Sequence, residues 1–467
     1  MSRLDVLRWC MAGAGAVILV CQLFLPPVVG LADQGDFARM IGRFGYGPED
    51  RSPDAKYAFV AARYVPDPGF RLREWEQPGS EYLFVAPAVW INRIISRDGK
   101  LDIRMMGAIH VLVFLAILVW FQRVTRCLPA APLLWLAALL IFTDVGYTAY
   151  WNSFYAEPAS CLFVLLLVTE TIALMQTTYG SPARWTLWAI LLVTAKPQNA
   201  PLGLLLALLV PRLPGLPRNT RWPINSLLIV SAAIFTVVTV PKPMNEAAAY
   251  NTLFLGILPE SPHPAADLEA MGLSPEFVRY SGTGAWSPGT GFGEMVSAGI
   301  VGKTITPFAT LRFYLTRPAR IWRRTKVLLP VAFSLRPEWC GNYERSAGYA
   351  PGARSAAFAW WSGFHQRHLA RGGKAILILL AISPVLSVAA WIRFREHRRA
   401  IECFGVLCLA CLGSFLAAAL GDAWDNVKHL FLFNLLLDVI LLGVVSYTSM
   451  SLTTSPNTSV RRKSRPA

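Results

Sequence analysis

Long apolar runs separated by short polar segments dominate the chain, and their lengths predict how it is built. A helix needs about 20 predominantly apolar residues to cross the hydrocarbon core of a bilayer. Such runs recur along the whole chain, so we predict an all-α membrane protein with about ten transmembrane helices. The expected spans cover residues 9–31, 105–120, 128–142, 159–175, 185–195, 202–210, 224–240, 375–391, 401–420 and 430–447.

The distribution of Lys and Arg predicts the orientation of these spans. Short loops on the cytoplasmic side carry an excess of Lys and Arg. When successive spans are taken to cross in opposite directions, the segments that fall on the side of the N-terminus are basic. The first apolar run also lacks the small-residue cleavage site of a signal peptide. We therefore predict an uncleaved first span and cytoplasmic N- and C-termini. The basic residues on this side are Arg3, Arg8, Arg123, Arg126, Arg184, Arg212, Arg218, Arg221, Arg393, Arg395, Arg398, Arg399, Arg461, Arg462, Lys463 and Arg465.

Two long loops, residues 32–104 and 241–373, fall on the opposite, periplasmic side. In the first, the apolar run 82–95 is too short to span comfortably, and we predict a helix on the membrane surface. In the second, residues 311–332 mix Arg and Lys with apolar residues, as an interfacial amphipathic helix does. Its cations would contact either anionic lipid headgroups or a substrate phosphate.

One apolar stretch, residues 185–210, is interrupted by a polar segment with two prolines at 196–201. Proline cannot continue a helix across this point. We expect two abbreviated helices that meet at a polar periplasmic turn. Irregular backbone at membrane depth is tolerated where it is buried in protein or lines a wet cavity, so this turn is a candidate wall of a site.

Composition supports a membrane-embedded chain. Of its 467 residues, 54% are hydrophobic, and the mean hydropathy of +0.43 is too high for a soluble enzyme. The net charge of +16 would suit nucleic acid, but the basic residues lie between spans, so we exclude that partner. The eight cysteines lie mostly in expected spans and predict no disulfide framework. We expect one transmembrane domain at residues 1–450 and a disordered basic tail at 451–467.

Polar residues from four separate segments share one predicted depth, at the periplasmic end of the spans. Carboxylates there can accept a proton, and cations can hold an anionic group at the boundary between lipid and water. We therefore expect a site at this boundary. Its candidate residues are Asp33 and Asp36; Asn152 and Glu157; Lys196, Gln198 and Asn199; and Asp422, Asp425, Asn426, Lys428 and His429.

The acidic candidates also have structural interpretations. Asp33 or Asp36 could cap a following helix, a common role for Asp. Glu157 could lie at a helix start, where the macrodipole favours an anion. These interpretations compete with a role in proton transfer.

The basic candidates have alternatives of the same kind. Lys196 could extend to the headgroups from the end of a span, and Lys428 and His429 could neutralise neighbouring acids. His110 lies alone in an apolar run and is expected to pack as an ordinary helix residue. No dense cluster of His or Cys in the sequence predicts a metal site.

The order of these features resembles the GT-C superfamily of membrane glycosyltransferases: an acidic motif after the first span, a large outer loop, a second acid in a later turn and a final large loop. Four segments are similar to those of bacterial hexose transferases of surface-glycan biosynthesis. They are ADQGDF at 32–37, WNSFYAEP at 151–158, KPQN at 196–199 and YNTLFLGILP at 250–259. The resemblance runs through most of the chain, although each motif is short.

This resemblance implies an inverting transferase of the bacterial inner membrane, which moves a hexose from a polyprenyl-phosphate donor to a glycan or glycolipid at the periplasmic face. It implies Asp36 as the general base, with Asp33 as the rival, and cations that stabilise the leaving phosphate. Many relatives need no metal or other cofactor, whereas oligosaccharyl relatives use a divalent metal. The implied substrate-binding residues are Glu157, Asn152, Lys196, Gln198, Lys428, His429, Asp422, Arg320 and Arg324.

Three other functions remain open at this stage. A flippase or transporter of lipid-linked glycans would place ionisable groups near the bilayer midplane and often has repeated halves, and the sequence displays neither. An O-antigen-ligase-like enzyme would use a diphosphate-linked donor. A scaffold protein would carry no catalytic group. In every case membrane lipids are expected partners.

Overall fold

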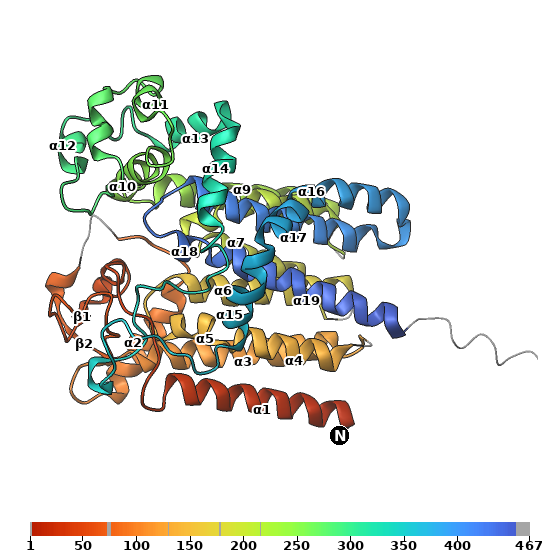
Figure 1. Cartoon of the computed structure of the whole chain (residues 1–467). Coiled ribbons are helices and arrows are strands. Elements are labelled where there is room, and N and C mark those ends of the chain that lie inside the picture. The colour runs from red at the N-terminus through yellow and green to blue at the C-terminus, as the bar shows by residue number, and fades with distance from the viewer. Residues whose placement is uncertain (1, 72–75, 129, 177–178, 215, 454–467) are drawn as a thin grey trace, which may run out of the picture.

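The computed structural model describes residues 2–71, 76–128, 130–176, 179–214 and 216–453. Most of this part is helical, and the longer helices lie side by side in a bundle (Figure 1). The loops gather at one end of the bundle, whereas the start of α1 and the end of α19 lie at the other (Figure 1). The long helices are α1 (Arg3–Leu23), α3 (Arg104–Thr125), α6 (Glu157–Met175), α9 (Arg218–Val238), α16 (Ala370–Arg393), α17 (Arg398–Leu420) and α19 (Phe431–Thr453).

Several of the described helices can cross a membrane, but fewer than the ten that we expected. Six are long and apolar enough, and a seventh is added if α4 (Ala131–Phe142) and the bent segment Val145–Asn152 form one span. The two parts of that pair meet at 46°. Helices form at the other expected positions but fall short in length or apolar extent. They are α7 (Pro182–Val193) and α8 (Leu202–Leu209). In α19 the side chains are described only as far as Val445, and this part, Phe431–Val445, is an apolar helix.

The bend after α4 has a local cause. The chain leaves α4 at Thr143 and restarts as α5 (Val145–Thr148), which continues into the 3₁₀ helix η5 (Ala149–Asn152). Asp144 takes an extended conformation and its side chain accepts a hydrogen bond from the Gly146 N–H at 2.7 Å. The carboxylate therefore caps the new helix and fixes the direction in which it starts.

The interrupted stretch forms two short helices, as predicted. α7 ends at Val193, a 3₁₀ turn η6 (Pro197–Asn199) follows, and α8 begins at Leu202. The turn is anchored to α6, because the Asn199 amide donates to the Ser160 hydroxyl at 2.8 Å. This anchor fixes the polar turn against the beginning of α6.

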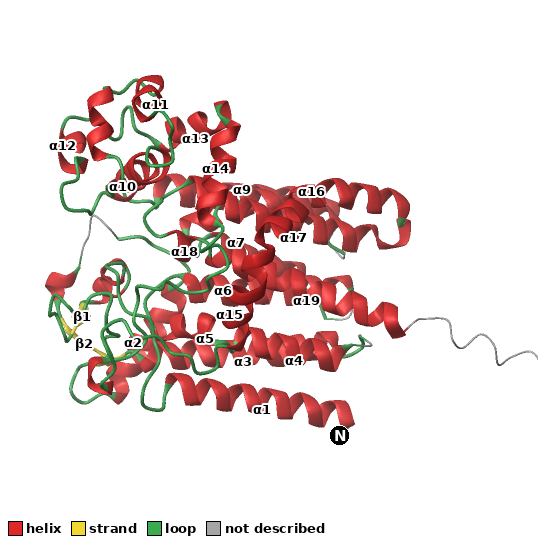
Figure 2. Ribbon diagram, viewed as in Figure 1, coloured by secondary structure: helices red, strands yellow, loops and turns green. Residues whose placement is uncertain are grey.

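The first long loop contains a small antiparallel sheet, which the all-α prediction missed. Its strands are β1 (Tyr46–Pro48), β2 (Arg63–Pro66) and β3 (Leu101–Asp102), in that order. Figure 2 shows β1 and β2 in yellow among the loops. Tyr46 pairs with Pro66, and Arg63 with Asp102. The strands are too short to display alternation in the sequence, yet they tie the start of the loop to its end.

A helix, α2 (Tyr82–Ile95), forms where the sequence predicted one on the membrane surface. Several of its large apolar side chains are exposed, Ile94 to 83%. Residues 32–104 also contain the 3₁₀ helices η1 (Phe37–Arg39), η2 (Ile41–Phe44) and η3 (Pro68–Phe70).

The second long loop has a hydrophobic core of its own, built around Tyr250, Leu253, Phe254 and Tyr314. The predicted single helix over 311–332 is two helices, because Pro318 has no N–H and forces Arg317 out of helical geometry. The described elements are α10 (Lys242–Tyr250), the π-helix η8 (Asn251–Ile257), α11 (Pro264–Ala270), η9 (Pro275–Tyr280), α12 (Phe292–Ser297), α13 (Pro307–Thr316), α14 (Pro318–Leu328), η10 (Arg345–Ala347), α15 (Trp360–Phe364) and the π-helix η11 (His365–Leu369).

Three short elements complete the described chain: η7 (Val210–Arg212), η12 (Arg395–His397) and α18 (Asn426–His429). The last helix, α19, continues to Thr453, so the predicted tail begins later than residue 451. Residues 454–467, on which the rest of that prediction falls, lie outside the described part.

Candidate functional site

Side chains from four segments meet at the loop end of the bundle, where the sequence predicted a site. The segments are the loop after α1, the start of α6, the turn between α7 and α8, and α18, which joins α17 to α19. The contacts described below join them into one cluster, which we call the polar cluster. Its members are Gln34, Asp36, Arg39, Glu157, Lys196, Gln198, Asp422, Asp425, Lys428 and His429.

Asp36 and Lys428 form the centre of the polar cluster. The Lys428 ammonium donates to the Asp36 carboxylate and also lies 2.9 Å from Asp425. Arg39 approaches the other oxygen of Asp36 at 3.1 Å. The side chain of Lys428 is only 5% exposed, whereas that of Asp36 is 23% exposed. Asp36 is therefore a charged, cation-bound carboxylate that solvent or a substrate can reach.

Asp33 has a different role from its neighbour. One of its carboxylate oxygens accepts from the backbone N–H groups of Gly35, Asp36 and Phe37, at 2.7, 2.9 and 3.2 Å. The Asp36 side chain makes no such capping bond, although Asp36 directly precedes η1. The capping role that sequence alone left open between the two acids thus belongs to Asp33. Asp36 is left to contact cations.

A second ion pair joins α6 to the α7–α8 turn. Lys196 donates to the Glu157 carboxylate at 2.7 Å, and the Glu157 side chain is 3% exposed. Glu157 is the first residue of α6, where the helix dipole also stabilises its charge. Lys196 therefore pairs with Glu157, and its positive charge also acts on Asp36 in the same cluster.

A third set of contacts joins the turn to α18 and to the second long loop. The side chains of Gln198 and His429 are hydrogen-bonded at 2.6 Å, and His429 lies 4.0 Å from Asp422. Asp422 also accepts from the Asn251 amide at 2.9 Å. Asn251 begins the π-helix η8, a geometry that often occurs at functional sites.

Charge and burial together set the protonation of the polar cluster. Burial opposes ionisation of Asp36, but the positive charges of Arg39 and Lys428 outweigh it and lower the pKa of Asp36 well below its usual value. Burial likewise opposes the charge of Lys428, yet Asp36 and Asp425 raise its pKa. Burial, aided by the charge of Lys196, lowers the pKa of His429 to about 3. At neutral pH the cluster therefore contains charged Asp36 and Lys428 and a neutral His429.

The acidic loop is clamped by two distant segments. The Tyr155 hydroxyl accepts from the Gln34 N–H at 3.1 Å and donates to the Ala32 carbonyl at 2.8 Å. The Tyr155 ring also lies under Lys428, 4.9 Å from the ammonium nitrogen. Residue 341 completes the clamp, because its carbonyl accepts from the Ala32 N–H at 3.0 Å.

Only glycine fits at that point of the clamp. A Cβ on Gly341 would lie 2.0 Å from the Ala58 carbonyl oxygen, which real atoms do not approach. The Gly341 N–H donates to the Tyr57 carbonyl at 2.8 Å. Tyr57 itself has a φ of 67°, which is rare for a residue with a side chain, so surrounding contacts must hold it.

Three of the predicted substrate-binding residues make structural contacts. The Asn152 amide donates to the carbonyls of Leu23 and Val29, at 2.9 and 2.8 Å, below the polar cluster. Arg320 pairs with Asp267 within the second loop. These two side chains are held outside the cluster, and their contacts support a structural role.

The third of these residues, Arg324, lies closer to the polar cluster. Its guanidinium pairs with Glu260 at 2.6 Å and reaches the Asn426 side chain at 3.2 Å. It also donates to the Ala419 carbonyl at 3.1 Å. Arg324 therefore docks the second loop onto the α17–α18 turn, and its side chain is almost fully buried.

Several members of the site were not singled out from the sequence. Gln34 donates to Asp425, and Arg39 pairs with Asp36, so both extend the acidic motif. The Lys56 ammonium nitrogen lies 3.0 Å from the position of a Cβ on Gly35, above the acidic loop. The spacing of residues 34, 36 and 39 was visible in the sequence, whereas the position of Lys56 depends on the fold of the first loop.

A buried pair of side chains, His110 and Glu81, contacts the first turn of α6, which carries Glu157. His110 bonds to Glu81 at 3.0 Å through one ring nitrogen and to the Trp151 carbonyl at 3.0 Å through the other. The second oxygen of Glu81 accepts from the Ala159 N–H at 2.9 Å, in the first turn of α6. The His110 side chain is buried in the bundle, as predicted. Its partner Glu81 positions the start of α6.

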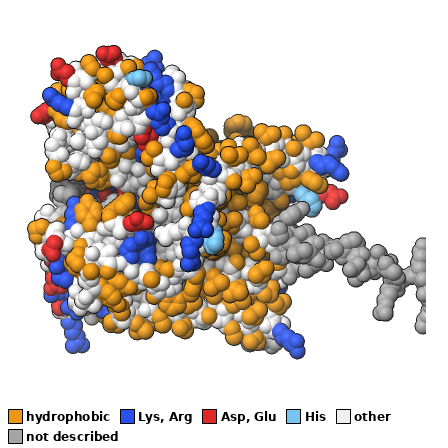
Figure 3. Space-filling view, viewed as in Figure 1, with side chains coloured by type: hydrophobic (Ala, Val, Ile, Leu, Met, Phe, Trp, Pro, Cys, Tyr) orange, Lys and Arg blue, Asp and Glu red, His pale blue; other side chains and the backbone are white. Residues whose placement is uncertain are grey.

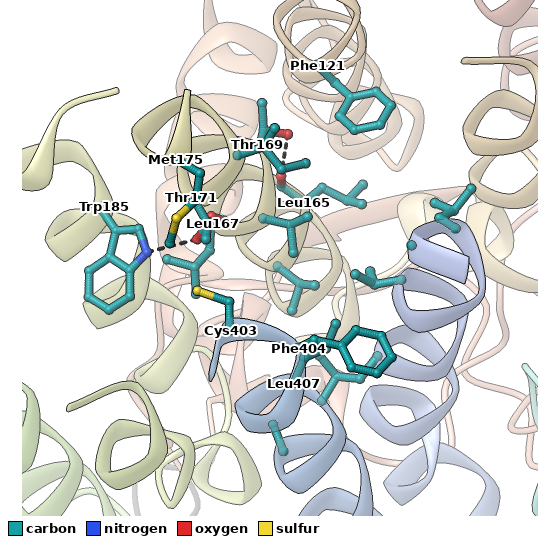
Figure 4. A pocket seen from close by; sticks show the side chains of 18 of the residues that line it. Phe121, Leu165, Leu167, Thr169, Thr171, Met175, Trp185, Cys403, Phe404 and Leu407 are labelled. Atoms are coloured by element: carbon teal, nitrogen blue, oxygen red, sulfur yellow. Dashed lines mark hydrogen bonds between the residues drawn. The ribbon is translucent and has the colours of Figure 1, made fainter. Parts of the chain in front are cut away.

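An apolar cavity of about 480 Å³ lies deeper in the bundle. Its lining comes from α3, α4, α6, α7, α8, α17 and α19 (Figure 4). The α6 residues that line it begin at Val164, seven residues or about 10 Å along the helix from Glu157. Polar side chains in its wall are hydrogen-bonded to other protein groups. For example, the Trp185 indole N–H donates to the Thr171 hydroxyl at 3.0 Å (Figure 4). The cavity therefore suits a hydrocarbon chain.

Within the described ranges, no three His, Cys, Asp or Glu side chains come together in a geometry that could hold a metal ion. Three carboxylates of the polar cluster, those of Asp36, Glu157 and Asp425, are paired with Lys or Arg.

Comparison with known proteins gives one result. No curated protein and no solved structure matches this chain. The family model described as the YfdI N-terminal transmembrane domain matches residues 10–463. With several apolar helices and nearly its whole length covered by that match, the chain is a membrane protein that belongs to the YfdI N-terminal transmembrane domain family.

Proposed function

We propose that this chain is an inverting glycosyltransferase that moves a hexose from a polyprenyl-phosphate donor to a glycan or glycolipid acceptor, with Asp36 as the general base. The observation that carries the proposal is the position of Asp36, a partly exposed carboxylate between Lys428 and Arg39 at the loop end of an apolar bundle. Membership of the YfdI family, which is related to GT-C-like glycosyltransferases, adds support, as do the motifs quoted above.

The proposed step is a single displacement at the anomeric carbon. The acceptor hydroxyl oxygen forms a bond to that carbon while Asp36 takes the hydroxyl proton. The bond between the sugar and the donor phosphate breaks, and its electron pair leaves with the polyprenyl phosphate. The anomeric centre is inverted, and Asp36 later returns the proton to water.

The cations of the polar cluster match the needs of the leaving group. A phosphate leaving group carries its own negative charge, so it needs charge stabilisation more than protonation, and fixed cations away from bulk water supply it. Lys428 and Arg39 contact Asp36, and Lys196 lies nearby. We assign these three residues to the phosphate.

Donor binding then also activates the base. A carboxylate with a strongly lowered pKa is a weak base, because it holds a proton poorly. A donor phosphate that attracts Lys428 and Arg39 weakens their pairing with Asp36, which raises the pKa of Asp36 towards its ordinary value. The base would therefore become effective only when the donor is present.

The apolar cavity supports a lipid-linked donor. Its lining is almost wholly apolar, and it lies on the α6 face that leads down from Glu157. A polyprenyl chain could occupy it while the phosphate reaches the polar cluster. We extend the proposal to the ten-span topology in the bacterial inner membrane, with the cluster facing the periplasm, because the basic residues fall on the opposite side.

The test is a transfer assay with purified full-length protein, a panel of polyprenyl-phosphate hexoses and a membrane-glycan extract. We expect Asp36→Asn to retain its thermal unfolding midpoint within a few degrees and to lower the transfer rate about 100- to 10,000-fold. Asp98→Asn is the matched control, since Asp98 is an exposed acid of the same loop. It should retain full activity.

Other outcomes identify the alternatives. Full activity of Asp36→Asn would remove the base assignment. Release of polyprenyl diphosphate would indicate a ligase-like reaction, and movement of a lipid-linked glycan across sealed vesicles without bond formation would indicate a transporter. Loss of wild-type activity with a chelator, restored by a divalent cation, would show a metal requirement.

A further inference from the structure

Six exposed Lys and Arg side chains lie on α13, α14, η11 and the start of α16, in the second long loop and at its junction with the bundle. Lys and Arg side chains gather there, between the loops and the apolar side of the bundle (Figure 3). We call these six side chains the cationic belt. Its residues are Arg312 on α13, Arg323 and Lys326 on α14, Arg367 on η11, and Arg371 and Lys374 on α16.

The two halves of the cationic belt are joined by direct packing. A Cβ on Gly373 would lie 2.6 Å from the Phe333 ring and 3.0 Å from Leu329. The chain just after α14 therefore presses against the start of α16. This contact brings Lys326 close to the segment that carries Arg371 and Lys374.

The cations of α14 differ in their contacts. Arg320 and Arg324, one turn apart, face inward and pair with Asp267 and Glu260. Arg323 and Lys326 are exposed, and the Arg323 guanidinium donates to the backbone carbonyl of Glu260 at 2.7 Å. Among the described residues, no carboxylate lies within ion-pair distance of a belt cation. Carboxylates thus neutralise the inner cations of this helix, whereas the charges of the outer ones have no carboxylate partner within the part of the chain that the structure describes.

Large apolar side chains are interleaved with the cationic belt. Trp322 and Val327 are about half exposed beside Arg323 and Lys326, and Phe308 and Leu315 are exposed on α13. Below Lys374, the exposed residues of α16 become apolar, beginning with Ile378 and Leu379. Cations followed by an exposed apolar surface match the order of headgroups and acyl chains in a lipid leaflet.

We propose that the cationic belt binds the headgroups of anionic phospholipids at the loop-side leaflet. This inference is independent of the proposed transfer reaction. A soluble anion would gain nothing from the neighbouring Trp, Phe and Leu side chains, whereas a phospholipid contacts both kinds of surface. Bound headgroups also explain why a basic face is tolerated at this end of the protein, since the phosphates neutralise it.

The experiment compares two triple variants of the full-length protein in a neutral detergent. Arg367→Gln/Arg371→Gln/Lys374→Gln removes half of the belt. Arg393→Gln/Arg395→Gln/Arg399→Gln removes the same charge from exposed positions at the other end of α16 and is the matched control. Each protein is titrated with short-chain phosphatidylglycerol or phosphatidylcholine. Binding is read by native mass spectrometry and by the thermal unfolding midpoint.

We expect wild type to bind phosphatidylglycerol more tightly than phosphatidylcholine. The belt variant should bind phosphatidylglycerol at least about tenfold more weakly, since each basic residue near an anionic surface is worth about a fivefold change. The control variant should change less than about threefold. If the belt variant fails to fold, Arg312→Gln/Arg323→Gln/Lys326→Gln removes the other half and should have the same effect.

The proposal is overturned by any of three results: wild type binds the two lipids equally, the belt variants retain the wild-type preference, or the control variant loses as much affinity as the belt variant. The last result would place the lipid site at the opposite end of the bundle.

Discussion

The polar cluster and the surroundings of Asp438 each contain a central carboxylate, Asp36 and Asp438, and the two carboxylates differ in the partners that they contact. Asp438 lies within α19 and is fully buried. It accepts from Tyr147 at 2.5 Å, from Trp361 at 2.8 Å and from His365 at 2.8 Å. Asp36 instead pairs with Arg39 and Lys428, and Lys428 also pairs with Asp425.

This difference separates an acid whose contacts hold the fold together from one whose partners can be exchanged. The three groups around Asp438 come from two segments distant from α19, so its hydrogen bonds cross-link the bundle to the second long loop. Nothing from outside can replace them without unfolding the region. The partners of Asp36 can exchange it for another anion, because its side chain is partly exposed and Lys428 would still be paired with Asp425.

The strongest test of this comparison is Asp438→Asn. The Asn amide has one acceptor oxygen where the carboxylate has two. Its NH₂ group would therefore lie against groups that donate to Asp438 in the wild type. We expect a loss of about 3 kcal/mol in the free energy of unfolding, with the activity per folded molecule changed less than about threefold. Unfolding in detergent and the transfer assay measure the two quantities. A stable variant with little activity would place Asp438 in the chemistry and erase the distinction.

A second test uses acid sensitivity, because the polar cluster contains a neutral histidine. Burial and the charge of Lys196 lower the pKa of His429 from 6.5 to about 3. Between these pH values the unfolded chain binds the proton and the folded chain does not, so this contribution to stability is present above pH 6.5 and declines as the pH falls. Each pH unit in the window costs at most about 1.4 kcal/mol.

We therefore expect His429→Gln to unfold with a shallower dependence on pH than wild type between about pH 6.5 and 4. Chemical unfolding at several pH values measures the slope, and His368→Gln, at an exposed histidine, is the control. Parallel curves for wild type and His429→Gln would show that His429 is not held neutral in the folded protein.

The smallest effect is expected at Asp33. Asn caps helices about as well as Asp, so Asp33→Asn should change the free energy of unfolding by less than about 0.5 kcal/mol and retain activity. Asp33→Ala removes the cap and should cost about 1 kcal/mol. Melting curves and the transfer assay on both variants decide the point. An inactive but stable Asp33→Asn would make Asp33 the base in place of Asp36.

The sequence predicted the position of the polar cluster better than its pairing. Asp36, Glu157, Lys196 and Lys428 each follow or precede an apolar run, so the runs alone place them at one depth. Which cation meets which acid depends on how the helices pack around one another. The pairing of Lys196 with Glu157, 39 residues apart, and of Lys428 with Asp36, 392 residues apart, has no local signal.

Other features were hidden for the same reason. Glu81 and His110 each look unremarkable in the sequence, and only the packing of α2 against α3 joins them. The four-residue spacing of Arg320 and Arg324 predicts a common helix face, but not that the face turns towards Asp267 and Glu260. Strands of two to four residues carry too few positions for an alternating pattern.

The clamp on the acidic loop has a consequence for the order of assembly. The loop emerges early in synthesis, but Gly341, which fixes it, and Lys428, which completes the Asp36 pair, emerge much later. At about 5–20 residues per second, Asp36 precedes Lys428 by roughly 20–80 s. A ribosome-bound chain therefore carries an incomplete polar cluster during most of its synthesis, and the cluster is completed only when the last helices join the bundle.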